Sequence, residues 1–495
     1  MQEVFCLAGK AADMIAGVRG PVLTYGDRLY WGLLMTKFKF ARLAGVSAAA
    51  LMIAGAAHAE SLADAIAMAY SNNPTLTRAR SQQQATDETY VQTKSQLGPS
   101  LTAGASVTDA DHGSIFSPRS TTAADISATQ TLFASGGLSA SLAASKDNVL
   151  SGQQSLRSTE GQVLLNVISV YTAVYRDQQS LQISQDNYDI LKKQLDQTQA
   201  QFDAGQLTRT DVAQSQARLS ASAAALAQAQ AQLDGDRASY VAIVGQSPVA
   251  LDPVPDLPGL PADFNSALDT AQNNNPDLVA AKYAENAAKD NLRAEKSVFG
   301  PTIGLSASLG ESAATKDLHL GGTEEASTTL RLSIPLFSSG LNGSRVRQAS
   351  DNYSAQQSTT ELTRRQVVAD VSQAWSQMLA AKSAVTSNQE QVNAAQVAAD
   401  GVKTEQQVGL RTNIEVLNAE QELKSAQLDL VNAERTQYVA AAQLLEVMGN
   451  LTAQTFDSSA TIYDPNKHFD KVKAKGWTPL EPVVNALDGL AARTH

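Results

Sequence analysis

An internal duplication constrains the fold of this 495-residue chain more than any other feature of its sequence. The motif Asn-Asn-Pro at residues 72–74 recurs at 274–276, and Leu-Phe-x-x-Gly at 132–136 recurs at 336–340. The displacement changes only from 202 to 204 residues between the two motifs, which chance matches would not maintain. We therefore predict two similar structural repeats joined by a proline-rich linker. The repeats are residues 60–247 and 263–450, and the linker is residues 248–262.

Each repeat holds a long proline-free stretch with the spacing of coiled-coil helices. No proline occurs within 119–247 or 336–464, and apolar residues recur there at steps of three and four. Gly205 and Gly409 suit the turn between two helices, because glycine often ends a helix. A capping box, Thr-x-x-Asp or Thr-x-x-Glu, follows each glycine. The pattern predicts one helical hairpin in each repeat. The hairpins are residues 137–247 and 340–450.

Four shorter segments alternate apolar residues with small polar ones, which predicts strands with one apolar face. Leu101 and Val107 belong to the clearest of them. Segments of about ten residues suit a tilted crossing of a bilayer, and faces of Ser, Thr and Gly suit a water-filled lumen. A soluble sheet packed on an ordinary core is the alternative. The predicted strands are residues 100–109, 124–133, 301–310 and 327–336.

Aromatic residues mark the junctions between the predicted strands and helices. Phe133, Phe299 and Phe337 lie there, where an aromatic girdle at a membrane interface is expected. Four strands are too few for a closed barrel, since the smallest bacterial barrels have about eight. Open sheet edges are not tolerated in lipid. The strands therefore indicate an obligate oligomer that shares one barrel.

Residues 35–59 show the three-part pattern of a secretory signal peptide. A basic patch at residues 37–42 precedes an uncharged run rich in Ala, Leu, Val and Ile, which is too short for a membrane-spanning helix. An A-x-A motif ends at Ala59, and we predict cleavage between Ala59 and Glu60. An N-terminal core helix is the alternative. Met35 stands where a signal peptide begins, so we interpret residues 1–34 as a mis-assigned start.

Charge and composition favour an exported protein that is not an enzyme. The net charge of −11 makes nucleic acid an unsuitable partner, because phosphate binding needs clustered Lys and Arg. The single Cys6 excludes a disulfide within the chain. His112, His319, His468 and His495 lack metal-ligand spacing, so we expect no cofactor. The alternative from another class is an exported structural coiled-coil protein or a periplasmic adaptor without a pore.

Taken together, the two halves, the paired motifs and the run Val-Gly-Leu-Arg-Thr-Asn-Ile-Glu-Val-Leu at 408–417 resemble the TolC-type outer membrane factors. The resemblance implies a mixed α and β membrane protein of the Gram-negative outer membrane. It implies a homotrimeric, 12-stranded barrel continuous with a periplasmic tunnel of coiled-coil helices. It also implies a periplasmic adaptor, an ABC or RND-type inner membrane transporter and outer membrane lipid as partners. The cargo is a drug or, in type I secretion, a protein.

The same resemblance points to a channel gate at the hairpin turns. Arg411, Glu415 and Asn418 match positions that constrict the tunnel entrance in the family, and Thr210 and Asp211 match their contacts in the first repeat. Glu415 and Asn418 depart from the family, in which both positions carry Asp. The alternative is that Asp211 and Glu415 only cap helices. We expect the tail, residues 451–495, to surround the tunnel waist or to stay flexible.

Overall fold

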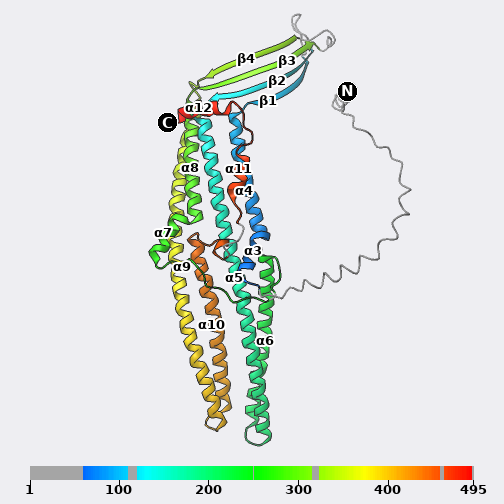
Figure 1. The fold of residues 1–495 in the computed structure, drawn as a ribbon, viewed down its shortest axis with the longest axis vertical. Helices are drawn as coiled ribbons and strands as arrows, with labels where there is room; N and C mark the ends of the chain where they lie inside the picture. Colours follow the sequence, from blue (N-terminus) through cyan, green and yellow to red (C-terminus); the bar gives the residue numbers. More distant parts are fainter. Residues whose placement is uncertain (1–59, 110–119, 249, 315–322, 457–461, 493–495) are drawn as a thin grey trace, which may run out of the picture. The chain divides into compact units, whose positions relative to one another are not determined.

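The computed structural model describes residues 60–109, 120–248, 250–314, 323–456 and 462–492. The predicted signal peptide and the residues before it, up to Ala59, lie outside the described residues. Two short helices, two strands and two long helices follow one another twice along the chain (Figure 1). No helix in the described ranges has the length and apolarity that crossing a bilayer requires.

The first half of the chain places two short helices before a pair of strands and a long helical hairpin. The predicted hairpin, 137–247, ends at Val244 because Gly245 has a left-handed φ of 97°. Its elements are α3 Leu62–Asn72, α4 Pro74–Lys94, the short helix η1 Ser95–Leu97, β1 Ser100–Asp109, β2 Ser120–Phe133, α5 Gly137–Asp203 and α6 Arg209–Val244.

The second half follows the same order, and a tail of short helices ends the chain. Asn73 and Asn275 cap α4 and α8 in the two halves, and each is followed by Pro at the first helical position. The elements are α7 Phe264–Asn274, α8 Pro276–Lys296, η2 Ser297–Phe299, β3 Thr302–Ala314, β4 Thr323–Ser333, α9 Leu341–Gln407, α10 Asn413–Val447, η3 Ala453–Thr455, α11 Pro465–Val472 and α12 Glu481–Ala492.

The two hairpin helices α5 and α9 are each 67 residues long and unbroken, which corresponds to about 100 Å at 1.5 Å per residue. Helix α5 continues through Gly152 and Gly161. The predicted seam is buried, since Val163 and Val167 lie in the core of the first half and Val371 in that of the second. Because narrow apolar stripes are buried only against other helices, α5 packs on α6 and α9 on α10.

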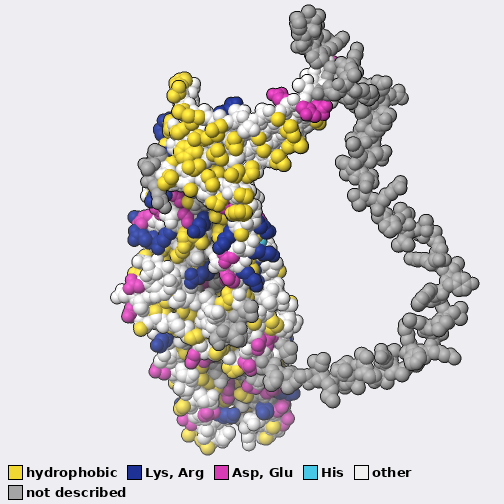
Figure 2. Space-filling model, turned by 45° about the horizontal axis from the view of Figure 1, so that its top comes forward, with side chains coloured by type: hydrophobic (Ala, Val, Ile, Leu, Met, Phe, Trp, Pro, Cys, Tyr) yellow, Lys and Arg dark blue, Asp and Glu magenta, His cyan; other side chains and the backbone are white. Residues whose placement is uncertain are grey.

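The four strands form one antiparallel sheet in the order β1-β2-β3-β4. Ile126 pairs with Leu309 across β2 and β3, which places the apolar residues of neighbouring strands on one face. That face carries large exposed side chains, with Leu101 at 73% and Leu309 at 61% exposure. Figure 2 shows these hydrophobic side chains gathered over the sheet. The apolar face therefore has no core beneath it, and a soluble sheet packed on a core is the wrong interpretation.

Three of the four strands have bounds that differ from the predicted ones, for identifiable reasons. Strand β2 begins at Ser120, because small polar residues there pair with β1 and β3 although they break the alternation. Strand β3 ends at Ala314, beyond the predicted residue 310, since its pairing with β4 continues to Ser312 and its pairing with β2 to Ala314. Strand β4 covers Thr323–Ser333 and ends before Pro335, which lacks the N–H that pairing needs. Phe337 consequently lies outside the sheet.

Gln130 interrupts the apolar face of β2, and the structure shows how its amide is accommodated. The side chain is buried, and Nε2 donates to the carbonyl oxygens of Leu97 at 3.1 Å and Thr131 at 2.7 Å. The register shifts directly afterwards, between Thr131 and Phe133. The polar residue thus fixes the end of the strand to η1, at the point where the chain leaves the sheet.

Candidate channel gate at the hairpin tips

The hairpin tips, residues 204–208 and 408–412, are tight glycine turns at the ends of the long helices. Gly205 and Gly409 have φ values of 75° and 81°. No atom lies within 4 Å of a Cβ built on either glycine, so the backbone conformation alone favours glycine there. Both tips end helices that begin at the strand ends, at Gly137 and Leu341. Each long helix therefore separates its tip from the sheet by its whole length.

Both carboxylates at the tips form the capping boxes that the sequence indicates. Thr208 Oγ1 donates to Asp211 Oδ2 at 2.7 Å, and the N–H of Thr208 donates to the same oxygen at 3.0 Å. These bonds hold the pKa of Asp211 below its usual value. The N–H and hydroxyl of Thr412 both donate to Glu415 Oε2 at 2.8 Å. Asp211 and Glu415 thereby stabilise the first turns of α6 and α10.

Arg411 binds two carboxylates of its own hairpin. Its Nε lies 2.7 Å from Glu405 Oε2 and its Nη1 lies 2.8 Å from Glu415 Oε1. The Thr412 N–H and the Arg411 guanidinium together lower the pKa of Glu415 to about 2. Within one chain, Arg411 therefore pairs with carboxylates of its own hairpin, and Glu415 both caps α10 and binds Arg411. Thr210 is exposed in the first turn of α6.

Other polar side chains join the two hairpins next to the tips. Arg218 Nη2 donates to Asn418 Oδ1 at 2.9 Å. The buried Asn413 accepts from Gln194 Nε2 at 2.7 Å and donates from Nδ2 to Ser215 Oγ at 2.9 Å. Of the predicted gate residues, only Asn418 takes part in this contact. Sequence reasoning missed Arg218, Gln194, Asn413 and Ser215. Polar residues at buried positions between two predicted helices are a signal that could have indicated them.

The aromatic residues predicted at the membrane interface lie where strands meet helices. Phe133 ends β2, and Phe299 lies in η2 directly before β3, with its side chain exposed. Phe337 is exposed between β4 and α9. At the predicted signal-peptide cleavage site, Ala59 lies outside the described residues. Glu60 forms an isolated parallel β-bridge with Leu251. Tyr240 OH donates to Glu60 Oε1 at 2.6 Å, which ties this residue to α6.

The described residues show no group of three or more His, Cys, Asp or Glu side chains that could hold a metal ion. His468 instead contacts Asp87, with Nδ1 2.9 Å from Oδ2. His112, His319 and His495 lie outside the described residues.

A sheet with an exposed apolar face, continued by two long helical hairpins, defines a channel protein of the Gram-negative outer membrane with a periplasmic helical tunnel. The sequence model described as "Outer membrane efflux protein" matches residues 65–246 and 267–450. The chain belongs to the outer membrane efflux protein family, as its resemblance to the TolC-type factors indicated.

Individual relatives agree with this assignment. The outer membrane efflux protein BepC of Brucella suis is 32% identical, over 86% of this chain and 95% of BepC. The alkaline protease secretion protein AprF of Pseudomonas aeruginosa is 25% identical, over 60% of this chain and 63% of AprF. The solved outer membrane protein VceC of Vibrio cholerae has the same fold, with a TM-score of 0.69, 19% identity and coverage of 78% of this chain and 96% of VceC.

Proposed function

We propose that three copies of this chain close one 12-stranded barrel in the outer membrane and join their hairpins into a periplasmic tunnel. The observation that carries the proposal is the sheet. It has four strands, a row of exposed leucines on one face, and edge strands β1 and β4 that each pair on one side only. Such edges need partners in lipid, and three copies supply a closed sheet.

The proposed role is that of the exit duct of a tripartite export system. In it, the tunnel would receive cargo from an inner membrane ABC or RND-type transporter through a periplasmic adaptor. Transport through such a duct needs neither a cofactor nor an enzymatic reaction of this chain. Efflux of small molecules is the first candidate, because the match to BepC covers most of both chains. Protein secretion is the second, because AprF is named for secretion of a protease.

The hairpin tips would act as the gate of this duct. Arg411 holds Glu405 and Glu415 at each α9–α10 tip, and the Arg218–Asn418 bond connects the hairpins of one chain. Exposed charge pairs of this kind are individually weak. Threefold repetition in one constriction would add these contributions and shift an equilibrium between closed and open tips.

Purification and conductance test the proposed duct. The detergent-solubilised protein should be a trimer that conducts ions in planar lipid bilayers. A stable monomer that needs no detergent would contradict the proposal and favour a fibre or an adaptor. Deletion of the gene separates the two cargoes. Sensitivity to drugs or detergents identifies efflux, whereas loss of a protein from the medium identifies secretion.

A further inference from the structure

The C-terminal helix α12 presents an apolar face away from the protein. Val484 and Asp488 are fully buried against the rest of the chain. The side chains that α12 exposes are apolar: Pro482, Val483, Ala486, Leu487 and Leu490. Leu490 is 68% exposed, and the preceding Trp477 is 60% exposed. A surface helix of a water-soluble protein has the opposite distribution, with its polar face outward.

The buried Asp488 fixes α12 at the end of the sheet. Its Oδ1 accepts from the backbone N–H groups of Ala134 at 2.8 Å and Gly136 at 2.9 Å, and its Oδ2 accepts from the N–H of Ser139 at 2.9 Å. These donors lie between the last residue of β2 and the first turn of α5, where helical N–H groups have no partner in the helix. The position of α12 is thus set by the strand end.

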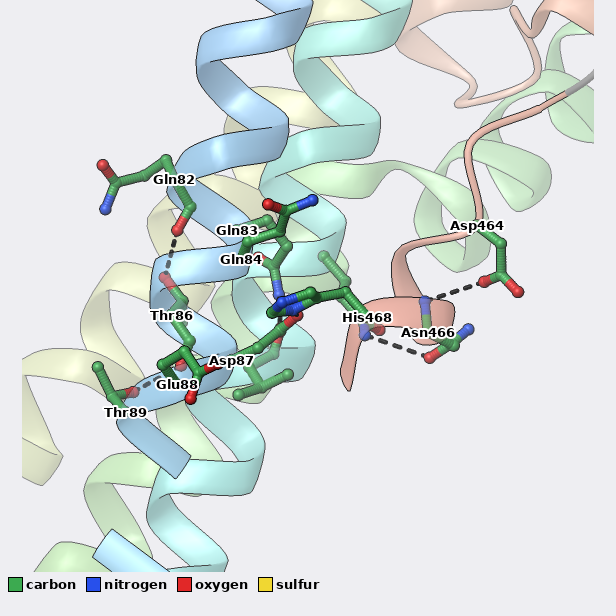
Figure 3. Close-up of polar contacts among 12 residues, drawn as sticks. Gln82, Gln83, Gln84, Thr86, Asp87, Glu88, Thr89, Asp464, Asn466 and His468 are labelled. Atoms are coloured by element: carbon green, nitrogen blue, oxygen red, sulfur yellow. Dashed lines mark hydrogen bonds and ion pairs between the residues drawn. The ribbon is translucent and has the colours of Figure 1, made fainter. Parts of the chain in front are cut away.

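Contacts along α4 lead the tail to this position. His468 of α11 lies next to Asp87 of α4 (Figure 3). Further along, Lys94 Nζ donates to the carbonyl oxygen of Lys473 at 2.8 Å and pairs with Glu481 at 3.2 Å. The end of the tail therefore lies at the strand ends.

Helix α12 lies at the end of the sheet, at the level of Phe133. Helix α12 contacts β2, α5 and η1, and Figure 1 shows it at the foot of the sheet. Phe133, the last residue of β2, directly precedes Ala134, to which Asp488 is bound. Strand β2 pairs with β1 and β3 within the chain, so α12 contacts an inner strand, whereas neighbouring copies would join at the edge strands.

We propose that α12 and Trp477 lie in the periplasmic headgroup region of the outer membrane, with the apolar face of α12 against phospholipid acyl chains. The proposal rests on the barrel of the proposed function, since the barrel sets the level of the bilayer. A helix with one apolar face binds at such an interface through the burial of that face, and Trp prefers the headgroup region. A rigid attachment to the barrel would hold the helix at that depth.

Quenching of tryptophan fluorescence by lipid tests the proposal. The chain has three Trp residues, and Trp31 precedes the predicted cleavage site, so Trp375→Phe leaves Trp477 as the single fluorophore of the exported form. The exported form of this variant is reconstituted into vesicles of phosphatidylethanolamine and phosphatidylglycerol, with or without bromine on the acyl chains near the headgroup. We expect brominated lipid to remove most of the Trp477 emission.

Two control variants separate this inference from the proposed function. In the variant with all three Trp residues replaced by Phe, Leu309→Trp reports on the apolar face of the sheet and Leu410→Trp on a hairpin tip. We expect quenching at 309 and none at 410. Quenching at 309 with none for Trp477 overturns the inference. If the Trp477 emission is then blue-shifted, a neighbouring subunit buries Trp477 in place of lipid. Absence of quenching at 309 overturns the barrel itself.

Discussion

Arg218 and Asn418 join the two hairpins of one chain, with Nη2 2.9 Å from Oδ1, although 200 residues separate them in sequence. Asn418 lies about two turns from its tip and Arg218 about three turns from its own. The buried Asn413 joins the same two helices through Ser215. A polar contact that can break without exposing apolar surface is suited to a place where helices separate. The proposed gate therefore depends on this contact as much as on the tip carboxylates.

Loss of either partner of this bond should favour the open tips. We expect Arg218→Ala and Asn418→Ala each to raise single-channel conductance, because each variant removes about 0.5–1.5 kcal/mol per chain. The double variant should add little to either single variant, since all three lack the same bond. Arg209→Ala, at the exposed start of α6, is the control. Fully additive effects would show that the two residues act separately.

The charge cluster at the tip predicts a second effect on conductance. We expect Arg411→Ala combined with Asp211→Ala to raise single-channel conductance while the trimer stays intact. Arg411 then no longer holds Glu405 and Glu415, and the capping box of α6 loses its carboxylate. Thr208→Ala is the control, because it removes cap contacts without removing charge. If a well-folded double variant conducts like the original protein, these residues cap helices and do not gate.

Glu446 predicts how stability depends on pH. Burial, together with Asp277 and Asp370, raises the pKa of Glu446 from 4.5 to about 7. A folded-state pKa above the unfolded one means that the folded protein binds more protons between these values, so this residue's contribution to stability falls as pH rises from about 4.5 to about 7. Glu446→Gln should thus stabilise the protein by about 1–3 kcal/mol at pH 8 and have little effect at pH 4.

Thermal unfolding followed by circular dichroism at several pH values measures this effect. Glu422→Gln, at an exposed position of the same helix, is the matched control. If Glu446→Gln changes the unfolding temperature equally at pH 4 and pH 8, ionisation of Glu446 does not destabilise the folded protein.

Asp488 predicts a loss of stability that is local to the tail. Asp488→Ala leaves three N–H groups at the β2–α5 junction without their acceptor, which should cost about 2–4 kcal/mol. Limited proteolysis should then remove α12 before the rest of the protein is cut. Asp470→Ala is the control, since its exposed carboxylate pairs with Lys473. Equal protease resistance of the two variants would contradict the role of Asp488.

The signal peptide predicts the first residue of the exported form. N-terminal sequencing of the protein from cell envelopes should begin at Glu60, whose N–H donates to the carbonyl oxygen of Ala250 at 2.7 Å. Ala59→Arg should block cleavage and cause the precursor to accumulate, whereas Glu60→Gln should be processed normally. An envelope form that retains Lys37 would refute the predicted cleavage.

The sequence predicted those parts of the fold that depend on local pattern. Val163 and Val367 lie in buried seams because a period near 3.6 specifies a helix face, and Leu101 is exposed on a strand face because alternation specifies that face. Thr208 and Thr412 cap helices, as their spacing indicated. Each of these features depends on neighbours within a few residues.

The contacts that sequence reasoning missed join residues far apart in the chain. Asp488 binds the N–H of Gly136 across 352 positions, and no periodic pattern connects an acidic residue in a tail with a distant strand end. Placement of such side chains depends on the packing of whole helices, which spacing along the sequence does not specify.

The unbroken helices α5 and α9 let each hairpin tilt as one rigid body about the end of the strands. A tilt of about 5° at the end of a rigid helix of about 100 Å displaces its far end by roughly 9 Å. In the proposed channel, angular changes too small to disturb the sheet would therefore open a passage of molecular width at the tips. In a subunit built this way, a small rotation at the strand end becomes a large displacement at the tip, without a hinge inside the helix.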